Sequence, residues 1–154
     1  MMEIQVKVNG RVETWREAPG RILLEVLRER GYTSVKHGCG EGDCGACTVL
    51  LDGQAVRACL LVVGQVADRE LTTAEGLGRP DAPHPLQQAF VECGAVQCGF
   101  CTPGMLLSAK SLLDETSRPS REQVREVLDG NLCRCTGYKK IIEAVELAAE
   151  RMSR

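Results

Sequence analysis

Several features that mark other classes of protein are scarce or missing in this sequence. Aromatic residues make up only 3% of the 154 positions, and no apolar run approaches the roughly 20 residues that a membrane-spanning helix needs. The formal net charge of −2 provides no basic excess for binding nucleic acid or an anionic membrane surface. We therefore expect no nucleic-acid partner and no membrane span.

Two kinds of sequence signal are also missing. Residues 1–15 contain no basic stretch followed by an apolar core, so no secretory signal peptide is recognisable and we expect a cytoplasmic location. The chain has no Walker motif and no dinucleotide-binding glycine fingerprint, because the glycines of residues 40–45 lie between cysteines. Nucleotide cofactors are therefore not expected on this chain.

Cysteine, in contrast, is abundant and grouped. Eight of the nine cysteines form two sets of four, and four thiolates are the usual ligand number of an iron–sulfur cluster. The first set begins with the C-x4-C-x2-C run of plant-type ferredoxins, and the second combines C-x2-C with C-x-C. Two sets predict two redox centres, and hence electron transfer. The sets are Cys39, Cys44, Cys47 and Cys59, and Cys98, Cys101, Cys133 and Cys135.

Disulfides and zinc are the alternatives for such cysteines. Disulfides belong mainly to oxidising compartments, and an odd number of cysteines fits complete pairing poorly. Zinc accepts C-x2-C pairs, and the second set alone would satisfy a four-thiolate zinc site. However, four glycines within residues 38–47 allow the first loop to curl around a cluster and direct N–H groups at sulfur. Such contacts tune a redox potential and are not needed by zinc, so the sequence favours iron–sulfur clusters.

The first half of the chain predicts a small mixed sheet with one helix. Ile4, Val6 and Val8 alternate with polar residues before Asn-Gly, a strong hairpin signal, and residues 12–15 form the returning strand. Residues 21–30 have the apolar spacing of a helix. A second hairpin is expected over residues 48–58, around Asp-Gly.

The second half predicts a helical bundle. Glycine and proline are frequent in residues 78–85, which indicates a connection between two parts of the chain. Four amphipathic segments follow, and four helices on a short chain most simply pack as a bundle. The second cysteine set lies on the turns between them, so one bundle end is expected to bring its members together. The segments are 86–93, 103–115, 121–128 and 139–152.

Three motifs give the chain a close resemblance to a known family. GCGEGDCGACTVLLDG, AVQCGFCTPGM and GNLCRCTGY are all present, and the likeness extends over residues 3–152. The chain resembles the two-cluster iron–sulfur subunit of the xanthine dehydrogenase family of molybdenum hydroxylases. The resemblance implies an α+β fold: a β-grasp, ferredoxin-like [2Fe–2S] domain over residues 1–76, then an all-α four-helix-bundle [2Fe–2S] domain over residues 77–154.

The resemblance also implies partners and a direction of electron flow. A large subunit would hold a molybdopterin cofactor and a further subunit FAD, in a hetero-oligomer. Single electrons would pass from molybdenum through the helical-domain cluster and then the ferredoxin-domain cluster to FAD. Xanthine or another purine is the default expectation for the substrate, which would bind on another chain. A free-standing ferredoxin-like carrier is the alternative, and an exposed apolar patch on the bundle would favour the subunit.

Individual residues take roles from the same resemblance. The eight grouped cysteines are implied to be the cluster ligands. Gln97 and Cys135 match residues that contact the pterin of the molybdenum cofactor. Cys93, the ninth cysteine, matches no ligand, and a free cysteine usually behaves as a small buried hydrophobe.

Overall fold

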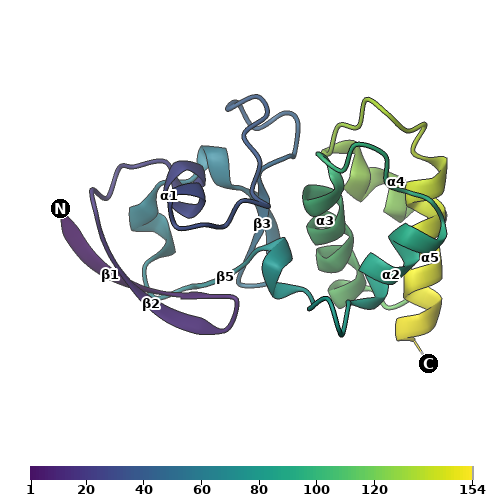
Figure 1. Ribbon diagram of the computed structural model, residues 1–154, viewed down its shortest axis with the longest axis horizontal. Coiled ribbons are helices and arrows are strands. Elements are labelled where there is room, and N and C mark those ends of the chain that lie inside the picture. The colour runs from purple at the N-terminus through teal and green to yellow at the C-terminus, as the bar shows by residue number, and fades with distance from the viewer. Residues whose placement is uncertain (154) are drawn as a thin grey trace.

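The chain forms a small sheet crossed by one helix, beside a bundle of four helices (Figure 1). The computed structural model describes residues 1–153. The sheet part contains β1 Met2–Val8, β2 Arg11–Glu17, α1 Leu23–Glu29, β3 Thr48–Leu51, β4 Gln54–Arg57 and β5 Glu70–Thr72. The short 3₁₀ turns are η1 Ala58–Leu60, η2 Val63–Val66 and η3 Ala74–Gly76. The bundle contains α2 Pro85–Glu92, α3 Thr102–Glu115, α4 Arg121–Asp129 and α5 Lys139–Met152.

The sheet is mixed, with the strand order β2-β1-β5-β3-β4. The central pair β1 and β5 is parallel, and the other pairs are antiparallel. Asn9 and Asp52 have positive φ angles of 49° and 50°, each followed by a positive-φ glycine, which matches the hairpin turns that the sequence predicts. The buried residues of β1, Trp15 and α1 share one core. This arrangement is a β-grasp fold and confirms the predicted class.

The bundle is built from amphipathic helices whose apolar faces meet. α2 packs on α5, α3 on α4, and α4 on α5, and a second core runs from Leu86 to Ala149. The predicted capping box is present, because Ser120 Oγ accepts from Gln123 N at 3.2 Å. α2 begins with an unpredicted cap, in which His84 Nδ1 accepts from Leu86 N at 3.2 Å.

The two parts are joined mainly by α3, which packs against β3 and β4 (Figure 1). Ser111 of α3 contacts the turn and the second strand of this hairpin: its hydroxyl donates to Gly53 O at 3.1 Å and accepts from Ala55 N at 3.2 Å. Each part has its own core; the predicted boundary between residues 76 and 77 stays a prediction. Among residues 1–153, no helix combines the length and apolar character needed to cross a membrane.

Candidate iron–sulfur sites

The first cysteine set lies on the loop that leads into β3. Gly40, Gly42 and Gly45 all have positive φ angles, of 77°, 89° and 71°, which only glycine adopts without strain. The loop turns its backbone toward the thiols, so that Glu41 N donates to Cys39 Sγ at 3.3 Å. A Cβ at Gly38 would lie only 2.6 Å from Cys44 Sγ. Gly38 is therefore required by the close approach of its backbone to sulfur, and Gly40, Gly42 and Gly45 by their positive φ angles.

The thiols of the first set influence one another's pKa. Cys39 is affected by Cys44, and Cys47 is affected by both Cys59 and Cys44. Backbone N–H groups, first that of Cys44 and then that of Glu41, lower the pKa of Cys39 to about 6. Burial raises the pKa of Cys47 to about 11. Backbone donors thus reach Cys39, while Cys47 and Cys59 are buried.

The second set gathers at one end of the bundle, as predicted. Cys98 and Cys101 lie between α2 and α3, and Cys133 and Cys135 lie between α4 and α5. The pKa of Cys98 is affected by Cys135 and Cys133, and that of Cys101 by Cys133 and Cys98. Burial raises the pKa of Cys101 to about 12. Burial also raises the pKa of Cys133. However, the backbone N–H and the hydroxyl of Thr136 donate to Cys133 Sγ at 3.4 and 3.1 Å, and the pKa of Cys133 is lowered overall.

The two sets of four thiols fit clusters of two metal ions better than single ions. All nine cysteines are free thiols. Within residues 1–153, no three or more His, Cys, Asp or Glu side chains form a group that could hold a single metal ion. A [2Fe–2S] cluster takes four thiolates, two at each iron, whereas zinc takes four ligands around one ion. Together with the N–H groups directed at sulfur, this donor set fits two [2Fe–2S] clusters.

The two sites differ in the solvent exposure of their cysteines. Cys98 and Cys135 are exposed, and so is Gln97. Apolar side chains near them in sequence are also exposed: Phe100 is 48% exposed and Leu132 60%. The helical site thus presents sulfur at a partly apolar surface, the type of patch that marks an interface. Cys93 is half-buried, packs against the bundle core and ends α2.

The two cysteine loops contact each other directly. Leu132 N donates to Cys44 O at 2.9 Å, Asn131 Nδ2 donates to Gly45 O at 3.0 Å, and Arg57 reaches Gly130 O at 2.6 Å. None of these contacts is visible in the sequence, because each joins residues more than seventy positions apart. The only sequence signal at Asn131 is its place two residues before Cys133.

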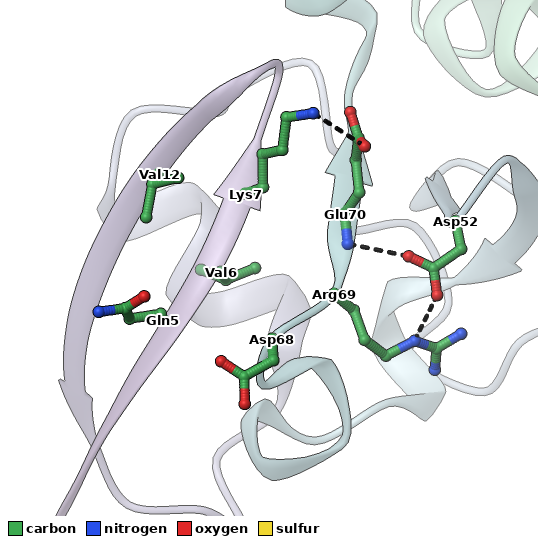
Figure 2. Close-up of a pocket in the computed structure, with 8 residues that line it drawn as sticks. All are labelled: Gln5, Val6, Lys7, Val12, Asp52, Asp68, Arg69 and Glu70. Atoms are coloured by element: carbon green, nitrogen blue, oxygen red, sulfur yellow. Dashed lines mark hydrogen bonds and ion pairs between the residues drawn. The ribbon is translucent and has the colours of Figure 1, made fainter.

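A separate hollow lies on the sheet, away from both cysteine loops (Figure 2). It has a volume of about 400 Å³ and lies between β1, β5 and the second hairpin. Four of its charged groups pair with one another: Lys7 with Glu70 at 3.1 Å, and Arg69 with Asp52 at 2.7 Å. Asp68 also lines the hollow, and its carboxylate is in no ion pair within residues 1–153.

Comparison with known families divides the chain in the same way as the two sites. The family described as "2Fe-2S iron-sulfur cluster binding domain" matches residues 6–77. The family described as "[2Fe-2S] binding domain" matches residues 73–146.

Relatives match both parts together. The nicotinate dehydrogenase small FeS subunit of Eubacterium barkeri is 49% identical over 149 residues, covering 96% of this chain and 95% of the relative. The xanthine dehydrogenase iron–sulfur-binding subunit of Escherichia coli O157:H7 is 42% identical over 147 residues, covering 92% and 91%.

Comparison with solved structures leads to the same family. Quinoline 2-oxidoreductase from Pseudomonas putida 86 superposes with a TM-score of 0.94 at 44% identity, over 99% of this chain and 96% of that chain. The aldehyde oxidoreductase from Desulfovibrio desulfuricans gives a TM-score of 0.96 at 50% identity, but this chain spans only 17% of that longer chain. The protein belongs to the family of two-cluster iron–sulfur subunits of molybdenum hydroxylases.

Proposed function

We propose that this chain passes single electrons from the molybdopterin cofactor of a large subunit to the FAD of a further subunit, within a cytoplasmic hetero-oligomer. The observation that carries the proposal is the direct contact of the two cysteine loops through Leu132 and Cys44. A subunit explains the second site and its apolar surroundings, whereas a diffusible carrier needs only the first site. The family's small subunits match this chain almost from end to end, which supports the subunit over the carrier.

The eight grouped cysteines are the proposed ligands. Cys39, Cys44, Cys47 and Cys59 would hold the cluster of domain 1–76, and Cys98, Cys101, Cys133 and Cys135 that of domain 77–154. When bound, a [2Fe–2S] cluster supplies a centre that takes up one electron at a time. The chain contributes the N–H groups that stabilise the thiolates and the burial that excludes water, and both influence the potential.

The helical site is proposed to face the molybdenum subunit. Cys98 and Cys135 are exposed, and the exposed Phe100 and Leu132 supply apolar area of the kind that an interface buries. Gln97, exposed beside Cys98, would hydrogen-bond the pterin cofactor on the partner, and Cys135 would contact the same pterin. Electrons would enter here and leave through the first site toward FAD.

The substrate is determined by the large subunit, because function depends on the site and this chain contains no substrate site. The named relatives act on different compounds, including nicotinate, xanthine and quinoline. The expectation of xanthine or another purine stays a prediction, and mass spectrometry of copurifying subunits would test it.

Rapid mixing of the assembled complex with its substrate tests the direction of electron flow. With Cys101→Ser, molybdenum should still be reduced, while flavin reduction becomes very slow because the entry site is lost. With Cys44→Ser, electrons should reach the helical site and stop there. Normal flavin reduction in a Cys101→Ser complex that lacks the helical cluster would contradict the proposed order.

A further inference from the structure

A single buried amide connects the two cysteine loops. Asn131 is only 1% exposed and forms three side-chain hydrogen bonds. Its Oδ1 accepts from Ser108 Oγ at 2.7 Å, and its Nδ2 donates to Gly45 O at 3.0 Å and to Thr48 Oγ1 at 3.4 Å. The amide therefore ties α3, the first cysteine loop and β3 to the segment that precedes Cys133.

Two glycines leave just enough room for this amide. A Cβ at Gly45 would lie 2.2 Å from Gly130 O and 2.6 Å from Asn131 Nδ2. A Cβ at Gly104 would lie 2.4 Å from Gly45 O and 2.9 Å from Asn131 Nδ2. Since real Cβ atoms do not approach this closely, the backbones of the two parts meet only because both residues are glycine. The junction is thus closely packed around Asn131, and interiors of this kind transmit small shifts.

Tyr138 holds the other side of the same segment. Its hydroxyl donates to Asn131 O at 2.8 Å and accepts from Cys133 N at 2.8 Å. Tyr138 has a φ angle of 64°, which costs energy for a bulky residue and persists where the surroundings impose it. The carbonyl of Asn131 and the N–H of Cys133, on either side of Leu132, are both bonded to Tyr138. The N–H of Leu132 is directed at Cys44 O.

We propose that Asn131 is a positioning residue for electron transfer, because its side-chain amide fixes the separation and orientation of the two cysteine loops. The proposal rests on the proposed function of the chain as a relay. Electron tunnelling between centres weakens steeply with distance, so a loop that shifts slightly changes the rate strongly. Asn131 contacts neither thiol set through its side chain and acts on them only through the backbone of residues 44–45 and 132–133.

The test compares Asn131→Ala with Asn9→Ala in the full chain loaded with both clusters. Asn9 is a matched control, because its amide bonds Thr73 through both Oδ1 and Nδ2, within the sheet part and away from the junction. Both variants should be less stable to heat. Only Asn131→Ala should alter the magnetic interaction between the two reduced clusters, seen as a changed splitting of their paramagnetic resonance signals.

A second variant covers the case in which Asn131→Ala does not fold. Ser108→Ala keeps the amide of Asn131 but removes the donor that orients its Oδ1, and it should produce a smaller change in the same splitting. In the assembled complex, Asn131→Ala should slow flavin reduction, since the rate of electron tunnelling falls as the separation of the two centres increases.

The possible outcomes separate the two proposals. Unchanged splitting and an unchanged flavin-reduction rate in a correctly loaded Asn131→Ala chain would overturn the positioning role and leave the relay intact. If the unsubstituted complex never reduced flavin through this chain, the relay itself would be wrong. A change of equal size in Asn9→Ala would show that general loss of stability, and not the junction, controls the splitting.

Discussion

The peptide N–H of Leu132 donates a hydrogen bond to the carbonyl oxygen of Cys44 over 2.9 Å. Cys44 belongs to the first thiol set, and Leu132 is bonded directly to Cys133 of the second. A path of covalent bonds and one hydrogen bond therefore runs from one thiol set to the other through the backbone alone. This contact gives the proposed relay a direct backbone connection between the two thiol sets.

The two thiol sets should be separable by mutation. Cys44→Ser should remove the cluster of the sheet part, and Cys101→Ser that of the bundle, because each set lies beside its own core. Iron analysis should show a fall from about four irons to about two in each variant, with one of two resonance signals lost. Cys93→Ala is the control and should retain both signals; loss of either would show that the assigned ligands are wrong.

Gly104→Ala should destabilise the protein even though it lies inside α3. Alanine favours a helix over glycine by about 1 kcal/mol, but the new Cβ would lie 2.4 Å from Gly45 O. Overpacking of this kind costs about 1–3 kcal/mol, and each kcal/mol lowers Tm by about 2–4 °C in a chain of this size. Thermal unfolding provides the measurement.

Gly20→Ala serves as the control for this substitution, because no atom lies within 4 Å of the Cβ it would add. Its Tm should stay close to that of the unsubstituted chain. A Gly104→Ala chain as stable as the unsubstituted protein would mean that the two domains can separate at the junction without cost.

The cap at His84 should make α2 sensitive to pH. Burial, then Lys110, lowers the pKa of His84 below its ordinary value of 6.5, and Asp114 opposes them. The folded protein therefore binds protons less readily here than the unfolded chain. The stabilisation that neutral His84 contributes is fully present above pH 6.5. It is lost progressively as the pH falls from 6.5 through the lower pKa that His84 has in the folded protein.

His84→Asn tests this prediction, because asparagine also caps helices but does not titrate. The difference in free energy of unfolding between the two chains should change in favour of the variant as the pH falls below 6.5. The size of the change is set by how far the pKa of His84 in the folded protein lies below 6.5. A difference independent of pH would contradict the protonation of His84 as its cause.

Gln97→Ala should leave both clusters intact and weaken retention of the molybdenum cofactor in the assembled complex. Loss of one buried hydrogen bond to the cofactor would cost about 1–3 kcal/mol. The molybdenum and pterin that remain after dialysis are the measurement. Gln88→Ala is a suitable control, since Gln88 Nε2 donates to Pro83 O within this chain. Equal retention of molybdenum and pterin in both variants would show that Gln97 does not contact the cofactor.

Much of the local structure was predictable because its causes are local. Both Asx-Gly hairpins, the Ser120 capping box and α5 over residues 139–152 are confirmed. β5 was missed, since three residues are too few for an alternating pattern and the strand depends on pairing with β1 and β3. The His84 cap was missed because histidine has little capping preference of its own.

The sequence by itself determined the two cysteine sets, the two-part fold and the family, because thiolate spacing and hydrophobic periodicity are written along the chain. Only the tertiary structure decided how the two sites meet. Asn131 and Gly45 are 86 positions apart, and nothing in the spacing of either residue predicts the other. Their contact depends on α3 packing against β3, and therefore on the complete fold of both parts.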